Sequence, residues 1–133
     1  MSSFVLDASA LLAYLRDEAG AIVVEKALDR GAAISIVNWI EVLSKVAEVG
    51  GEPEELVSQL ENLSITGNCL EIVPLLEDDA ISIAKLRPAT RTLDLSLGDR
   101  SCLALGMKWR LPILTAAQIW VNLNLDAEIQ LLR

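Results

Sequence analysis

The hydrophobic positions of the chain alternate between short strand-like runs and segments with helical spacing. Apolar runs rich in strand-forming residues lie at 4–6, 32–37, 70–75 and 111–115, and helically spaced apolar residues follow each of them. Residues 128–131 alternate polar and apolar side chains, which is typical of a half-exposed edge strand. The predicted order is therefore β, α, α, β, α, α, β, α, α, β, α, β. This order favours an α/β fold in which helices pack on a mostly parallel sheet.

Polar residues place several of the helix boundaries. Asn38 has the spacing of an N-cap with Glu41 three residues later, and Ser96 stands in the same relation to Asp99. An earlier helix, which starts at an aspartate pair, must end before Pro88. These signals predict helix starts at Asn38 and Ser96 and a helix end before Pro88.

The chain has 133 residues, of which 53% are hydrophobic and only 4% are aromatic. No repeat, low-complexity tract or linker interrupts it, so we expect a single domain over residues 1–133. The first residues carry no basic signal-peptide region, and the longest uncharged run, 111–125, is shorter than the roughly 20 apolar residues that a membrane span needs. We therefore expect a soluble cytoplasmic protein that does not bind membranes.

Charge and residue usage exclude several classes of chemistry. The net charge of −8 argues against a non-specific nucleic-acid coat, although six of the eleven basic residues lie between Lys85 and Arg110 and allow a local basic face. The chain has no histidine, which excludes histidine-based catalysis. Cys69 and Cys102 stand far apart without zinc-like spacing and are interpreted as small core residues. Any chemistry must therefore use carboxylates.

Three carboxylates occupy comparable local positions. Asp7 directly follows the first strand, while Glu41 and Asp99 each lie three residues past a predicted helix cap. Each of them, taken singly, is well explained as a helix-capping acid. Bringing all three to one sheet edge costs on the order of 4 kcal/mol per close pair at an effective dielectric of 20, and a divalent cation would remove that repulsion. Ligation by oxygen alone favours Mg²⁺ or Mn²⁺.

Four segments of the sequence resemble the PIN domain, and more narrowly the toxin ribonuclease of the VapBC type of bacterial toxin–antitoxin pair. They are V-L-D-A-S-A at 5–10, N-W-I-E at 38–41, L-S-L-G-D-R-S-C-L-A-L at 95–105 and L-P-I-L-T-A at 111–116. The resemblance spans nearly the whole chain and implies a three-layer α/β/α fold. It also implies metal-dependent cleavage of RNA, a homodimer, and a cognate antitoxin whose tail occludes the active site.

The resemblance assigns roles to the three acids. Asp7, Glu41 and Asp99 match the first three acids of the family, which implies that they are catalytic and bind the metal. Asp7 and Asp99 would be the principal ligands, and Glu41 would hold or orient the attacking water. Where the family usually continues T-A-D, this chain reads T-A-A-Q at 115–118, so Ala117 stands at the fourth acidic position. This departure puts a second metal ion and full activity in question.

Three further residues are candidates for substrate binding. Ser9 and Thr115 are expected to contact a phosphate or a ligand carboxylate, and Arg100 is expected to contact the RNA backbone. The alternatives are a helix cap for Ser9 and a solvated helix face for Arg100.

Two other classes of function compete with a ribonuclease. The first is a catalytically weakened PIN-like binding module that keeps the dimer and the antitoxin contacts, and Ala117 is its main support. The second is another α/β ligand domain. A phosphoryl-accepting receiver lacks its aspartate and lysine at the expected strand ends, and no G-x-G-x-x-G follows any strand for a dinucleotide.

Overall fold

The computed structural model describes residues 1–133 and has the predicted order of elements. The strands are β1 (Phe4–Leu6), β2 (Ala32–Ser35), β3 (Leu70–Val73), β4 (Ile113–Thr115) and β5 (Ile129–Leu131). The helices are α1 (Ala8–Leu15), α2 (Ala21–Arg30), α3 (Ile36–Glu48), α4 (Pro53–Asn62), α5 (Glu77–Ala89) and α6 (Leu97–Trp109), with short 3₁₀ helices η1 (Arg91–Leu93) and η2 (Gln118–Asn122). The longest helices have 13 residues, and none is long and apolar enough to cross a membrane.

The sheet is parallel throughout, with the strand order β3-β2-β1-β4-β5. Val5 of β1 is paired with Ala33 of β2 on one side and with Ile113 of β4 on the other. The chain therefore builds the sheet outward from β1 in both directions, and the order reverses between β1 and β4. In open parallel sheets, ligands bind at the carboxyl ends of the strands beside such a reversal.

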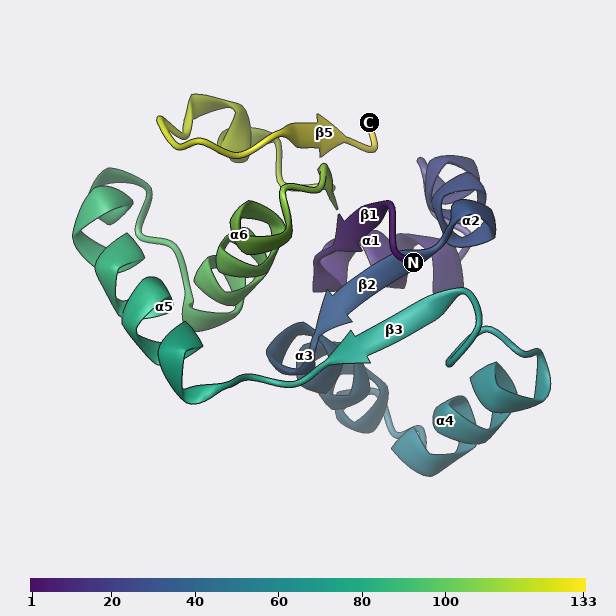
Figure 1. Ribbon diagram of the computed structural model, residues 1–133. Coiled ribbons are helices and arrows are strands. Elements are labelled where there is room, and N and C mark those ends of the chain that lie inside the picture. The colour runs from purple at the N-terminus through teal and green to yellow at the C-terminus, as the bar shows by residue number, and fades with distance from the viewer.

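Alternate residues of the central strands point into two separate cores. Leu6 packs among buried side chains of α1, α2, α3 and α4, whereas Val5 packs with α5, α6 and Trp120 of η2. Figure 1 shows the same division, with α5 and α6 on one side of the sheet and α1 and α2 on the other. This arrangement confirms the three-layer α/β/α fold. Cys102 is buried in the second core and Cys69 packs against the first, as expected for small apolar side chains.

The start of α3 differs from the prediction. Strand β2 ends at Ser35 instead of residue 37, and α3 begins directly at Ile36. The N-cap is Ser35, whose Oγ accepts a hydrogen bond from Val37 N at 3.2 Å. The assignment of Asn38 as the cap is therefore wrong, because the hydroxyl of Ser35 caps the helix and Asn38 lies in its first turn.

The end of α5 also differs from the prediction, because the helix continues through Pro88 to Ala89. Proline in a last helical turn removes only one backbone hydrogen bond. The helix ends at Thr90, which donates to Leu86 O from both its backbone N, at 3.0 Å, and its Oγ1, at 2.7 Å. The fourth strand is shorter than predicted, at Ile113–Thr115, and the last helix is the 3₁₀ helix η2.

Candidate active site

Asp7 lies at the carboxyl end of β1, where the chain turns into α1, and is only 5% exposed. Its Oδ1 accepts hydrogen bonds from Ser9 Oγ at 2.7 Å and from Ala10 N at 2.8 Å, so that Asp7 caps α1. Its Oδ2 accepts a hydrogen bond from Thr115 Oγ1 at 2.5 Å. The carboxylate is therefore held by hydrogen-bond donors from both α1 and β4.

The donors around Asp7 are themselves fixed by the backbone that follows β4. Ser9 Oγ accepts a hydrogen bond from Ala116 N at 3.0 Å, and Thr115 Oγ1 accepts one from Ala117 N, also at 3.0 Å. The two hydroxyl oxygens lie 3.4 Å apart. Ser9 and Thr115 thus join the ends of β1 and β4, and both direct their hydroxyls at the same carboxylate.

Burial raises the pKa of Asp7 above its ordinary value of 3.8. The hydrogen bonds from Thr115, Ser9 and Ala10 act in the opposite direction and lower this pKa, while the negative charge of Asp99 raises it further. The net effect is a buried carboxylate whose negative charge is unfavourable in the folded protein. Such a group gains from a nearby cation.

Glu41 projects from α3 toward the first turn of α6 and is half-buried. Its Oε1 accepts a hydrogen bond from Asn38 Nδ2 at 2.9 Å. A Cβ atom added to Gly98 would lie 2.5 Å from both carboxylate oxygens of Glu41, so the glutamate rests directly on that glycine. Since Ser35 caps α3, the alternative interpretation of Glu41 as a capping-box acid is wrong.

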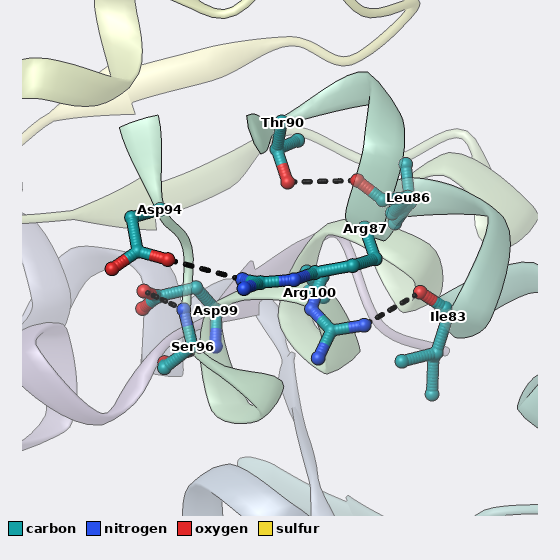
Figure 2. Close-up of polar contacts among 8 residues, drawn as sticks. All are labelled: Ile83, Leu86, Arg87, Thr90, Asp94, Ser96, Asp99 and Arg100. Atoms are coloured by element: carbon teal, nitrogen blue, oxygen red, sulfur yellow. Dashed lines mark hydrogen bonds and ion pairs between the residues drawn. The ribbon is translucent and has the colours of Figure 1, made fainter. Parts of the chain in front are cut away.

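Asp99 is the third residue of α6 and forms a capping box with Ser96. Ser96 N donates to Asp99 Oδ2 at 3.0 Å, and Asp99 N donates to Ser96 Oγ at 3.1 Å (Figure 2). This confirms the predicted cap. The capping uses only Oδ2, and Asp99 Oδ1 and Glu41 Oε2 accept no hydrogen bond from the chain. Both residues therefore retain a free carboxylate oxygen for a ligand.

The charges of the three acids converge on the inner side of α6. Burial raises the pKa of the Cys102 thiol well above its ordinary range, and the charges of Asp7, Asp99 and Glu41 raise it further. One thiol therefore experiences all three carboxylates, which come from the end of β1, from α3 and from α6 and lie far apart in the sequence.

The residues present suit a hard divalent cation. No group of three or more Asp, Glu, His or Cys side chains lies close enough together to hold a metal ion by itself. The available donors are all oxygens, which suit Mg²⁺ or Mn²⁺, and Mg²⁺ is usually held by one or two carboxylates together with water. The donor set therefore fits such an ion without a cage of three protein ligands.

Ala117 stands beside this cluster and offers no ligand. It is half-buried, precedes η2, and its backbone N is bonded to Thr115 Oγ1. The next residue, Gln118, is exposed and donates from Nε2 to the backbone carbonyl of Arg133 at 3.0 Å. Gln118 is thus engaged with the end of the chain, and Ala117 has no side-chain oxygen at the position where the resemblance predicts a fourth acid.

Arg100 points away from Asp99 and toward α5. Its Nη1 donates to the carbonyl of Ile83 at 3.1 Å, and its Nε is buried without a partner (Figure 2). The alternative of a fully solvated arginine is therefore wrong, because the side chain ties α6 to α5. Asp94 is exposed and forms an ion pair with Arg87 at 3.1 Å, which places it outside the carboxylate cluster.

Two residues of the site were not singled out as functional from the sequence. Asn38 is only 1% exposed and donates to both Glu41 Oε1 and Gly98 O. The spacing of three between Asn38 and Glu41 within a helix is the signal that could have indicated this contact. For Gly98 there is no comparable signal, because its role depends on how α3 packs against α6.

Both the sequence and the fold of the chain are similar to those of known proteins. Residues 4–118 match the family model described as PIN domain, and no curated protein matches the sequence. The fold is similar to that of DNA-bound VapBC from Salmonella typhimurium, with a TM-score of 0.73 and 16% identity over 100% of both chains. It is also similar to FitAcB from Neisseria gonorrhoeae (TM-score 0.71, 19% identity, 95% of each chain). A toxin-antitoxin complex from Klebsiella pneumoniae gives a TM-score of 0.66 and 21% identity over 92% of this chain and 93% of that chain.

Proposed function

Because the chain belongs to the PIN-domain family, we propose that it is a metal-dependent ribonuclease that hydrolyses phosphodiester bonds of RNA. The observation that carries the proposal is the buried Asp7 carboxylate, whose pKa is raised by burial and by the charge of Asp99. A buried acid with a second acid nearby, at the carboxyl edge of a parallel sheet, is typical of a functional site.

We propose that the three acids keep the roles that the family resemblance implies. Asp7 and Asp99 would be the principal ligands of Mg²⁺ or Mn²⁺, and Glu41 would bind the same ion and hold or orient the attacking water. The bound cation supplies a Lewis acid that offsets the charge of the phosphate and makes a water molecule more acidic. Ser9 and Thr115 keep both oxygens of Asp7 in place through their hydrogen bonds.

Substrate binding is proposed to involve the same edge of the sheet. Arg100 uses Nη1 for the carbonyl of Ile83, and we propose that its remaining guanidinium N–H groups would contact an RNA phosphate after the side chain turns from α5. Ser9 and Thr115 direct their hydroxyls at Asp7, so their effect on the substrate would be exerted through that carboxylate.

The biological setting proposed is that of a VapC-type toxin. The similar structures include VapBC and FitAcB complexes, and the likeness extends over nearly the whole of each chain. By this analogy the protein would form a homodimer in the cytoplasm and bind a cognate antitoxin that covers the active site. Co-expression with the protein encoded next to it, followed by purification of the pair, would test the partner.

A second candidate function is favoured by Ala117. Loss of the fourth acid would suit a catalytically weakened binding module that keeps the dimer and the antitoxin contacts. The two proposals differ in their response to metal, because an inactive module should show no rise in melting temperature with Mn²⁺. An active ribonuclease should show a rise that depends on the concentration of Mn²⁺.

The ribonuclease proposal is tested by cleavage of a fluorogenic RNA with the purified chain, with Mn²⁺ and with EDTA. We expect cleavage only with Mn²⁺, and none with Asp7→Asn purified in the same way. Equal cleavage by the wild type and Asp7→Asn would indicate a contaminating nuclease and would contradict the proposal.

A further inference from the structure

Asn38 is a buried polar residue within α3, with only 1% of its surface exposed. Asparagine is a poor helix former, and a buried amide is unfavourable unless hydrogen bonds compensate it. Helix capping does not explain the residue, because Ser35 is the N-cap of α3. An apolar side chain would suit the position better for stability alone, so Asn38 requires another explanation.

The Asn38 amide group is oriented by two acceptors. Its Nδ2 donates to Glu41 Oε1 at 2.9 Å and to the carbonyl oxygen of Gly98 at 3.0 Å. Turning the amide over would place its oxygen against two oxygens that can only accept. Asn38 Oδ1 is buried without a hydrogen-bond partner in the chain. The amide is therefore placed for its two donors, although its own acceptor is left unpaired.

Gly98 contributes to the same contact from α6. It lies within the helix and does not have a positive φ, so its backbone conformation does not require glycine. An added Cβ would lie 2.5 Å from each oxygen of the Glu41 carboxylate. The absence of a side chain at position 98 thus leaves the space that Glu41 occupies.

We propose that Asn38 is a positioning residue that holds the Glu41 carboxylate in the space above Gly98, next to Asp99. The inference rests on the proposed function, in which Glu41 orients the attacking water. A glutamate side chain has several rotatable bonds, and a fixed donor reduces the positions that its carboxylate can take. Asn38 would therefore affect the metal and the water only through Glu41.

The first test compares Asn38→Leu with the matched control Asn68→Leu. The two changes remove the same amide and add no charge, but Asn68 is exposed and lies at the opposite edge of the sheet, before β3. For Asn38→Leu we expect the Mn²⁺ Kd, measured by calorimetry, to weaken by about tenfold or more. We also expect kcat on RNA to fall with KM unchanged within about twofold, while the control matches the wild type. A purely structural role would lower the melting temperature and leave the Mn²⁺ Kd unchanged.

A second variant, Gly98→Ala, decides the question if Asn38→Leu does not fold. Alanine favours the helix, and the new Cβ meets only the flexible end of Glu41, so this variant should fold. It should nevertheless show the same weakening of Mn²⁺ binding. Wild-type Mn²⁺ affinity and kcat in whichever of these variants folds would overturn the inference. If the wild type neither binds Mn²⁺ nor cleaves RNA, the proposed function fails as well, and the wild-type measurement alone reveals this.

Discussion

Thr115 donates a hydrogen bond to Asp7 Oδ2 at 2.5 Å, across two neighbouring strands whose residues are 108 positions apart in the sequence. The contact links the end of β4 to the end of β1, where the strand order of the sheet reverses. It also anchors the one carboxylate that is almost fully buried. The candidate site therefore depends on pairing between the first and fourth strands.

Replacing Thr115 with valine keeps the shape of the side chain and removes the hydroxyl. Asp7 Oδ2 would lose its donor and Ala117 N its acceptor, so we expect the free energy of unfolding to fall by about 1–3 kcal/mol. RNA cleavage should fall on the order of 10- to 100-fold. Urea unfolding and the cleavage assay measure the two effects. Thr92→Val, on the exposed η1 segment, is the control, and equal behaviour of both variants would contradict the role of Thr115.

Asp7→Asn tests the cost of the buried charge in the metal-free protein. Burial raises the folded pKa of Asp7, so the unfolded chain loses this proton at a lower pH than the folded one. The free energy of unfolding of the wild type therefore falls as the pH rises from the unfolded pKa of Asp7 to its higher folded pKa, and it stays lower above that pH. Asp7→Asn should be as stable as the wild type or more stable at neutral pH, and this difference should shrink as the pH falls toward 3.8. Urea unfolding with EDTA across this pH range measures the difference. If the hydrogen bonds lowered the pKa of Asp7 more than burial raises it, the wild type would instead gain stability relative to Asp7→Asn as the pH rises.

Ser96→Ala separates the capping role of Asp99 from its proposed metal binding. Loss of the N-cap hydroxyl should cost about 1 kcal/mol of stability. Cleavage should change by no more than about threefold, because Ser96 N still donates to the Asp99 carboxylate. Asp99→Asn should show the reverse, with most of the cap retained and cleavage reduced by about 100-fold or more. Equal losses of activity in the two variants would mean that Asp99 acts only as a cap.

Ala117→Asp introduces the fourth acid that the family resemblance predicts at this position. We expect Mn²⁺ to bind on the order of tenfold more tightly, because an additional carboxylate raises the charge of the site. The metal-free protein should become less stable through repulsion with Asp7. Calorimetric titration with Mn²⁺ measures the affinity, and Ala117→Asn supplies the same shape without the charge. Identical Mn²⁺ affinity in both variants would show that position 117 does not face the metal.

Local signals in the sequence were sufficient for part of this description. The order of strands and helices could be predicted because each apolar run and each helical spacing is a local pattern. The capping box of Ser96 and Asp99 could be predicted for the same reason.

Contacts between distant segments could not be predicted in the same way. The pairing of β4 with β1, which brings Thr115 to Asp7, is not visible in either segment alone. The start of α3 was misplaced because Ser35 and Asn38 are both good caps, and only the fold decides between them. The contact of Glu41 with Gly98 depends on the packing of two helices that are far apart in the sequence.

We propose that carboxylates from the end of β1, from α3 and from the first turn of α6 bind one divalent cation. Anomalous diffraction from a crystal soaked in Mn²⁺ tests this claim most directly. It predicts a single strong peak in contact with the oxygens of Asp7 and Asp99, with Glu41 nearby, and no such peak in Asp7→Asn. A Mn²⁺ peak elsewhere on the protein, or none at saturating Mn²⁺, would contradict it.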